Sequence, residues 1–225
     1  MIHLKICGMK FPDNIEQVTV ALKPDYLGFI LYKGSPRYFD ADIPTLPSAL
    51  KKTGVFVNSS LPEVIASVMK HQLQAVQLHG EETPQFCEAL RQEFPQQQLE
   101  IIKAFPIAET LSNAVLQPYE GKADFFLFDT SGKTRGGTGK KFNWEVLLQY
   151  DSPTPFFLSG GIGPEEAESI IELKQQLDSR GLGQLLYGID LNSRFESEPG
   201  RKNIKDLKEF RNKLEQVLQP NNSKN

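Results

Sequence analysis

The stretch Asp124-Phe125-Phe126-Leu127-Phe128 contains four consecutive apolar residues and is followed at once by Asp129. Such an unbroken apolar run is typical of a strand that is buried on both faces, as the strands of parallel sheets are. Seven other short runs share this apolar character, and they cover residues 4–7, 26–31, 54–57, 75–78, 100–105, 155–158 and 185–189. The sequence therefore predicts eight buried parallel strands.

Segments with helical start signals lie between these runs. Thr83-Pro84 supplies an N-cap and a proline in the first turn, and Gly163-Pro164 opens another segment in a similar way. Pro44 and Pro47 interrupt the connection over residues 40–50, so its helix is expected to be short.

Eight strands that alternate with helices predict one architecture of the α/β class, a single (β/α)8 or TIM barrel. The barrel is expected to span residues 1–218, and the polar tail over residues 219–225 is expected to be disordered. The main alternative is an open doubly wound sheet, but such sheets usually contain fewer strands.

The composition excludes several classes of protein. The chain has 225 residues and a net charge of −3, which does not fit a nucleic-acid-binding protein. Its two cysteines, Cys7 and Cys87, form no C-x-x-C pair, which argues against a disulfide framework and a structural zinc site. The apolar runs are far shorter than the roughly 20 residues of a membrane helix, and no signal-peptide pattern opens the chain. We expect a cytoplasmic protein with no membrane or nucleic-acid partner.

Active sites of (β/α)8 barrels lie where the strands end and the following loops begin. Cys7 stands at such a point, and the period of two places His3, Lys5 and Cys7 on one face, toward the barrel interior. A lysine inside the barrel needs a partner, and its charge would lower the pKa of a nearby thiol. Cys7 is therefore a candidate catalytic group, with a small buried side chain as the alternative. Cys87, within a helix, fits only the second role.

Three polar residues follow other strands. Asp129 comes after four apolar residues, and such surroundings favour a protonated carboxyl group and suit a general acid, although a capping role is the alternative. Arg37, beyond the second strand, could clamp a carboxylate or phosphate with its forked guanidinium, or could be a solvated loop charge. His79, after the fourth strand, suits a general base and a structural hydrogen-bond donor equally.

The loops after the last two strands predict a phosphate site. Gly160-Gly161 lets the backbone approach an anion, and we expect a helix N-terminus near Pro164 to favour negative charge at the same place. Asp190 ends the eighth strand, and Asn192-Ser193 beyond it can add amide and hydroxyl donors. The competing explanation is that glycines end strands for steric reasons alone.

A glycine-rich stretch over residues 132–141 suggests nucleotide binding at first sight. Its spacing does not match the G-x-x-x-x-G-K-[ST] pattern of a phosphate-binding loop, so that interpretation fails. Its basic residues, Lys133, Arg135, Lys140 and Lys141, suggest a small anionic ligand. We expect a mobile loop over the mouth of the barrel.

Together these motifs resemble one family. Its segments occur in order from residue 3 to about residue 210, and they include Lys5-Ile6-Cys7-Gly8-Met9, Ser35-Pro36-Arg37-Tyr38, Gln77-Leu78-His79-Gly80, Phe128-Asp129, Ser159-Gly160-Gly161 and Gly188-Ile189-Asp190. The chain resembles the phosphoribosylanthranilate isomerases of tryptophan biosynthesis. The chain departs from the family pattern in places: Arg194 stands where glycine is usual, and Asn192 where serine is usual. Lys133 and Arg135 also make the loop after the sixth strand unusually basic. These departures bear on substrate affinity more than on the type of reaction.

The resemblance implies a reaction and a role for individual residues. The reaction is the Amadori rearrangement of N-(5-phosphoribosyl)anthranilate to 1-(2-carboxyphenylamino)-1-deoxyribulose 5-phosphate, with no cofactor and no metal. The general acid of the family matches Asp129, and its general base matches Cys7. The remaining site residues are expected to bind the substrate. Arg37 matches the position that meets its anthranilate moiety, and the loops with Gly160-Gly161 and Asn192-Ser193 match the phosphate site. Asp190 is also expected to bind the substrate.

Two other functions fit parts of the pattern. Another phosphate-binding barrel, such as an indole-glycerol-phosphate synthase-like lyase or a sugar-phosphate epimerase, would share the phosphate loops. A metal-dependent epimerase would need several His and carboxylate ligands, and of the three histidines only His79 is suitably placed. A non-catalytic phosphometabolite-binding barrel would need neither Cys7 nor Asp129. In every case the partner is a small phosphorylated metabolite, and both a monomer and a homodimer fit the sequence.

Overall fold

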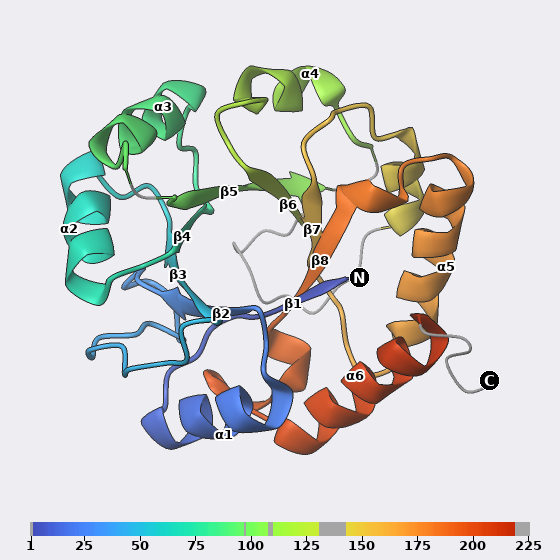
Figure 1. Cartoon of the computed structure of the whole chain (residues 1–225), viewed down its shortest axis with the longest axis horizontal. Coiled ribbons are helices and arrows are strands. Elements are labelled where there is room, and N and C mark those ends of the chain that lie inside the picture. Colours follow the sequence, from blue (N-terminus) through green and yellow to red (C-terminus); the bar gives the residue numbers. More distant parts are fainter. Residues whose placement is uncertain (1, 97, 108–109, 131–142, 219–225) are drawn as a thin grey trace.

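Eight parallel strands close into a barrel in the order of the sequence, because β8 pairs with β1. The computed structural model describes residues 2–96, 98–107, 110–130 and 143–218, and its helices surround the barrel (Figure 1). The strands are β1 (His3–Ile6), β2 (Tyr26–Ile30), β3 (Lys51–Phe56), β4 (Ala75–Leu78), β5 (Glu100–Ile107), β6 (Phe125–Thr130), β7 (Phe156–Leu158) and β8 (Leu186–Leu191). The predicted (β/α)8 barrel is confirmed, and the open doubly wound sheet is wrong.

Most of the strands are joined by helices on the outside of the barrel (Figure 1). The α-helices are α1 (Pro12–Leu22), α2 (Leu61–His71), α3 (Pro84–Glu93), α4 (Asn113–Leu116), α5 (Ala167–Ser179) and α6 (Ile204–Leu218). Short 3-10 helices are η1 (Gln117–Tyr119), η2 (Trp144–Gln149), η3 (Gly183–Leu185) and η4 (Ser193–Phe195), and β9 (Glu196–Glu198) pairs with β10 (Arg201–Lys202). The N-cap predicted at Thr83 is present, because its hydroxyl accepts a hydrogen bond from the amide of Phe86 at 3.3 Å.

The connection between β2 and β3, all of which the structure describes, contains no helix. The short helix predicted over residues 40–50 is therefore wrong. The two prolines in this segment have no backbone N–H to donate to a helix. The segment instead packs back on the barrel, where the ring of Phe39 meets Phe29 edge-on with 5.0 Å between centroids.

Apolar side chains fill two separate layers, because successive residues of a strand point to opposite faces. The larger layer lies between the strands and the helices. The smaller one fills the barrel and consists of Tyr26, Ala75, Ile102, Ala104, Phe125, Leu127 and Phe157. Since the interior is packed, small molecules are accommodated at the ends of the strands.

Lys5 lies fully buried between β1 and β8. Its Nζ donates to Oδ1 of Asp190 at 2.8 Å, and the two residues are direct neighbours in the strand register. The hydroxyl of Ser159, after β7, donates to the other oxygen of Asp190 at 3.3 Å. Asp190 is thus the partner that a buried lysine was predicted to need. Its contacts connect β1, β7 and β8 at Lys5, which lies two residues before Cys7 in the sequence.

Candidate active site

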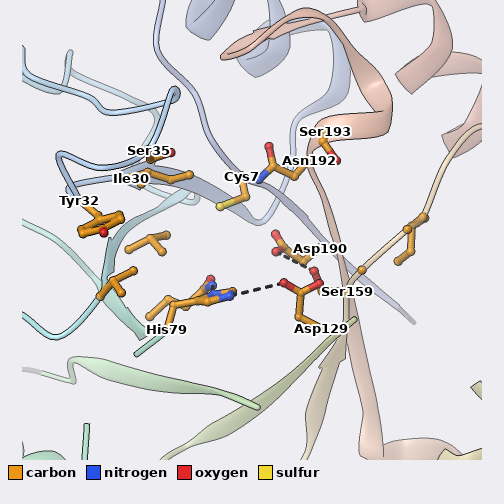
Figure 2. Close-up of a pocket in the computed structure, with 16 residues that line it drawn as sticks. Cys7, Ile30, Tyr32, Ser35, His79, Asp129, Ser159, Asp190, Asn192 and Ser193 are labelled. Atoms are coloured by element: carbon orange, nitrogen blue, oxygen red, sulfur yellow. Dashed lines mark hydrogen bonds and ion pairs between the residues drawn. The ribbon is translucent and has the colours of Figure 1, made fainter. Parts of the chain in front are cut away.

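A pocket opens at the carboxyl ends of the strands (Figure 2). It is lined by Cys7, Ile30, Tyr32, Ser35, Val55, Val57, Gln77, His79, Asp129, Ser159, Gly160, Gly161, Ile162, Asp190, Asn192 and Ser193. Every residue predicted to act on or bind the substrate is among them except Arg37. Residues from the first to the eighth strand thus converge on one cavity.

Cys7 comes directly after β1 and is 3% exposed. Gly28 on the neighbouring strand makes room for it, because a Cβ at that position would lie 2.7 Å from Sγ. Burial raises the pKa of the Cys7 thiol, and Lys5 and Lys202 oppose this rise while Asp190 adds to it. Lys5 lowers the pKa of the thiol, as predicted, but the loss of hydration outweighs the lysine charge, so the net shift is upward.

Asp129 faces the same pocket from β6, together with His79 after β4 (Figure 2). Nε2 of the imidazole lies 3.4 Å from Oδ2 of Asp129. Nδ1 lies 2.8 Å from the side-chain nitrogen of Gln77, two residues earlier on the same strand face. These contacts at both ring nitrogens orient the imidazole toward the carboxyl group. Of the two roles that the sequence allowed, general base and structural hydrogen-bond donor, they favour the structural one.

Arg37 does not line the pocket but lies behind it. Its Nε and Nη2 donate to the carboxylate of Glu196 at 2.9 and 2.7 Å, and the Arg37 side chain is 12% exposed. Lys202 donates to the same carboxylate at 2.6 Å. Burial alone would raise the pKa of Glu196, but the bonds from Arg37 and Lys202 hold it below its ordinary value. Arg37 is thus a buried ion-pair partner, not a solvated loop charge.

The loops after β7 and β8 bring the predicted phosphate residues together at the edge of the pocket. Gly160 and Gly161 have φ values of +78° and +71°, a conformation that glycine adopts without strain. The helix that follows begins at Ala167, so the N-terminus predicted near Pro164 is wrong. The reason is that the carboxylate of Glu166 accepts a hydrogen bond from the amide of Gly163 at 2.7 Å and closes a turn there.

Arg194 links the two loops from outside the pocket lining. Its guanidinium pairs with Glu165 and lies 3.9 Å from a carboxylate oxygen of Glu166. The extra cation at this position is therefore paired with acidic residues of the neighbouring loop. The basic stretch over residues 132–141 and the tail over residues 219–225 lie outside the described residues.

Several lining residues were not predicted from the sequence, above all the apolar wall of Ile30, Val55, Val57 and Ile162, together with Tyr32 and Gln77. A usable signal existed, since Gln77 and His79 alternate on one strand, as do Val55 and Val57, and alternation places each pair on the interior face. The same rule that predicted Lys5 would have found them.

No helix among the described residues is long and apolar enough to cross a membrane. No group of three or more His, Cys, Asp or Glu side chains in the described ranges has the geometry to hold a metal ion.

A closed parallel barrel with a thiol, a carboxyl group and an imidazole around one pocket at its carboxyl end defines the class, a (β/α)8-barrel enzyme. The family described as N-(5′-phosphoribosyl)anthranilate (PRA) isomerase matches residues 4–213 of the chain. The chain belongs to this family, and the resemblance noted in its sequence is confirmed.

Individual relatives agree with this assignment. The chain is 41% identical to an N-(5′-phosphoribosyl)anthranilate isomerase of Parabacteroides distasonis over 96% of its own length and 94% of the relative's. It is 38% identical to one of Phocaeicola vulgatus, with 96% and 99% of the two chains covered.

Among solved structures, the chain is similar to the phosphoribosyl anthranilate isomerase of Thermus thermophilus, with a TM-score of 0.77, 26% identity and coverage of 96% and 100%. A second isomerase structure, in complex with reduced 1-(o-carboxyphenylamino)-1-deoxyribulose 5-phosphate, has a TM-score of 0.72 and 26% identity, with 96% and 99% covered.

Proposed function

We propose that Asp129 and Cys7 serve as general acid and general base in the isomerisation of N-(5′-phosphoribosyl)anthranilate, the reaction that this chain catalyses as a member of its family. The observation that supports these roles is their convergence: a thiol from β1 and a carboxyl group from β6 line the same pocket as the paired glycines after β7. A turnover assay with phosphoribosylanthranilate, followed by the loss of its anthranilate-type fluorescence, tests the activity directly. A lyase, an epimerase or a binding protein would leave that signal unchanged.

The first step is the opening of the ribose ring. The protonated carboxyl group of Asp129 gives its proton to the furanose ring oxygen, the bond from that oxygen to C1′ breaks, and the nitrogen lone pair forms a Schiff base. His79, 3.4 Å from the carboxyl group, keeps Asp129 in a fixed orientation for this transfer. Proton donation to a poor leaving oxygen is the task for which a placed carboxylic acid is suited.

The second step is the removal of a proton from C2′. The Cys7 thiolate takes this proton, which the adjacent iminium makes acidic, and the electron pair of the C–H bond forms the C1′–C2′ double bond of an enolamine. The enolamine then tautomerises to the ketone. A thiolate is strong enough as a base here because the iminium withdraws electrons from the reacting carbon.

Substrate binding is assigned to the remaining pocket residues. The phosphate group would lie against the backbone amides of Gly160-Gly161 and the donors of Asn192-Ser193. Asp190 also faces the pocket, although its two oxygens already accept bonds from Lys5 and Ser159. We therefore place Asp190 at the floor of the site, in contact with the sugar portion of the substrate. Residues 1–218 would form the catalytic unit, and the cytoplasmic location remains a prediction.

Inorganic phosphate is expected to bind at the glycine pair and to compete with the substrate. Gly161→Ala should weaken this binding about tenfold or more, because an alanine at a φ of +71° carries strain of about 1–3 kcal/mol. Gly181→Ala is the matched control, since Gly181 has a φ of +72° and open space around its Cβ position. The inhibition constant of phosphate, measured for each of the two variants, shows the change. Equal inhibition constants in the two variants, or a phosphate-soaked structure with this pocket empty, would contradict the assignment.

Arg37→Ala is expected to lower kcat/KM by about 10- to 100-fold, since a hydrogen bond from a charged group contributes about 1.5–3 kcal/mol. The pairing with Glu196 uses Nε and Nη2, and a guanidinium has five N–H donors. Because Arg37 lies behind the pocket lining, contact with the anthranilate carboxylate requires its remaining donors to turn toward the pocket. Arg37→Lys should restore only part of the loss, because a point charge cannot replace the fork. Steady-state kinetics measure the effect. If the alanine variant has the same kcat/KM as the unchanged enzyme, Arg37 does not bind the substrate.

A further inference from the structure

Five charged side chains are buried together behind Cys7. Lys5 pairs with Asp190 at 2.8 Å, and their side chains are 0% and 5% exposed. Arg37 and Lys202 share the carboxylate of Glu196, and these side chains are 12%, 0% and 4% exposed, respectively. None of these charges is part of the proton transfers described above.

The second of these groups lies directly against the turn that follows Cys7. A Cβ added to Gly8 would lie 2.8 Å from Cδ of Arg37 and 2.7 Å from Oδ1 of Asn192. The same Oδ1 accepts a hydrogen bond from Nζ of Lys202 at 2.8 Å. Arg37 and Lys202 therefore lie next to the residue that adjoins Cys7, although they come from opposite ends of the chain.

The charges in this cluster do not cancel. Lys5, Arg37 and Lys202 are cations, whereas only Asp190 and Glu196 are anions, which leaves one positive charge in excess. An uncompensated charge in the interior is costly because it has lost its hydration. Ionisation of the Cys7 thiol would supply one negative charge at this place.

We propose that Lys202 is a positioning residue for the reaction: with Arg37 and Glu196 it supplies the excess positive charge that stabilises the Cys7 thiolate. This inference rests on the proposed role of Cys7 as the base. It explains how a thiol with 3% exposure can ionise at all. The lysine touches no reacting atom and acts only through Cys7.

The other charged groups around Cys7 are consistent with this role for Lys202. From β1 and β8, Lys5 lowers the pKa of the Cys7 thiol by its charge and a hydrogen bond, and the Asp190 charge raises it. Asp129 and His79 line the same pocket as Cys7. Lys202 lowers the pKa of Cys7 against the effect of burial. Burial lowers the pKa of Lys202 itself, while Glu196 and then Cys7 favour its charged form.

The test measures the ionisation of Cys7 without turnover. In a Cys87→Ser background, the rate of alkylation by iodoacetamide is followed against pH, because only the thiolate displaces iodide. Lys202→Met, which keeps the packing and removes the charge, should raise the midpoint of this curve by about one to two pH units, as loss of a neighbouring charge does. Glu196→Gln removes an anion from the same cluster and should lower the midpoint.

Lys103→Met is the matched control. Lys103 on β5 is as deeply buried as Lys202 and is also paired with a carboxylate, that of Glu82 at 3.4 Å, but it lies on the far side of the barrel from Cys7. This variant should leave the alkylation midpoint in place.

Opposite shifts in Lys202→Met and Glu196→Gln support the inference, and a merely structural role would not produce them. Unchanged midpoints, or shifts in the same direction, overturn it. If Lys202→Met does not fold, the Glu196→Gln variant tests the inference alone: a lower alkylation midpoint supports it, and an unchanged or higher midpoint overturns it. The role of Cys7 as base is tested separately by the activity of Cys7→Ser, so either proposal can fail while the other holds.

Discussion

Cys7→Ser is expected to lower kcat by about 10²- to 10⁴-fold, the range that proton transfer by a placed side chain contributes. Serine has nearly the volume of cysteine, but its hydroxyl hardly ionises near neutral pH, whereas a thiol has a pKa of about 8.5. The fold should survive, because the site already places polar groups around this position. Single-turnover kinetics with phosphoribosylanthranilate measure the change.

Cys87→Ser is the control for this substitution. Cys87 is fully buried on α3, and burial raises the pKa of its thiol to about 11. The variant should keep kcat nearly unchanged and lose only stability, because a hydroxyl is placed among apolar side chains. A Cys7→Ser enzyme that turns over at the rate of the unchanged enzyme would exclude Cys7 as the base.

Asp129→Asn is expected to be at least as damaging as Cys7→Ser. The amide keeps the shape of the carboxyl group and its contact to His79, but it has no acidic proton to give to the ring oxygen. Because the leaving oxygen then departs unprotonated, ring opening should become rate-limiting, and kcat should fall by more than about 10²-fold. Binding of a product-like phosphate should persist, since the glycine pair that would hold it lies on another loop.

Asp124→Asn tests whether such a loss is specific. Asp124 precedes the same strand at its opposite end, where it accepts a hydrogen bond from the amide of Ile101 at 2.7 Å and pairs with Arg91 at 2.9 Å. Its replacement should lower the melting temperature and leave kcat within a small factor. Full activity of Asp129→Asn would mean that another group protonates the ring oxygen.

The strands were predictable because burial on both faces leaves a nearly continuous apolar run. All eight runs correspond to strands of the barrel, with boundaries displaced by at most three residues. The connection before β3 and the start of α5 were predicted wrongly. In the first place the packing of Phe39 on Phe29 holds the segment, and in the second a local hydrogen bond from the amide of Gly163 to the carboxylate of Glu166 forms a turn before the helix.

The candidate site followed from one rule, that polar residues at the carboxyl ends of barrel strands face one opening. This rule placed Cys7, Asp129 and the glycine pair correctly in the pocket. It could not reveal that Arg37 pairs with Glu196, because these residues are 159 positions apart and no local pattern links them. The rule also could not predict the direction in which the pKa of Cys7 shifts, because this depends on how completely the folded chain excludes water from the thiol.

The ion pair between Lys5 and Asp190 spans 185 positions of the sequence. During synthesis, the first strand leaves the ribosome early, and its partner emerges only when the chain is nearly complete. Until then β1 presents an open edge, and such edges invite pairing with other chains. The Cys7 thiol and its charged surroundings are therefore completed only when β8 joins the barrel. We expect a chain that ends before β8 to have an exposed edge at β1 and no enzymatic activity.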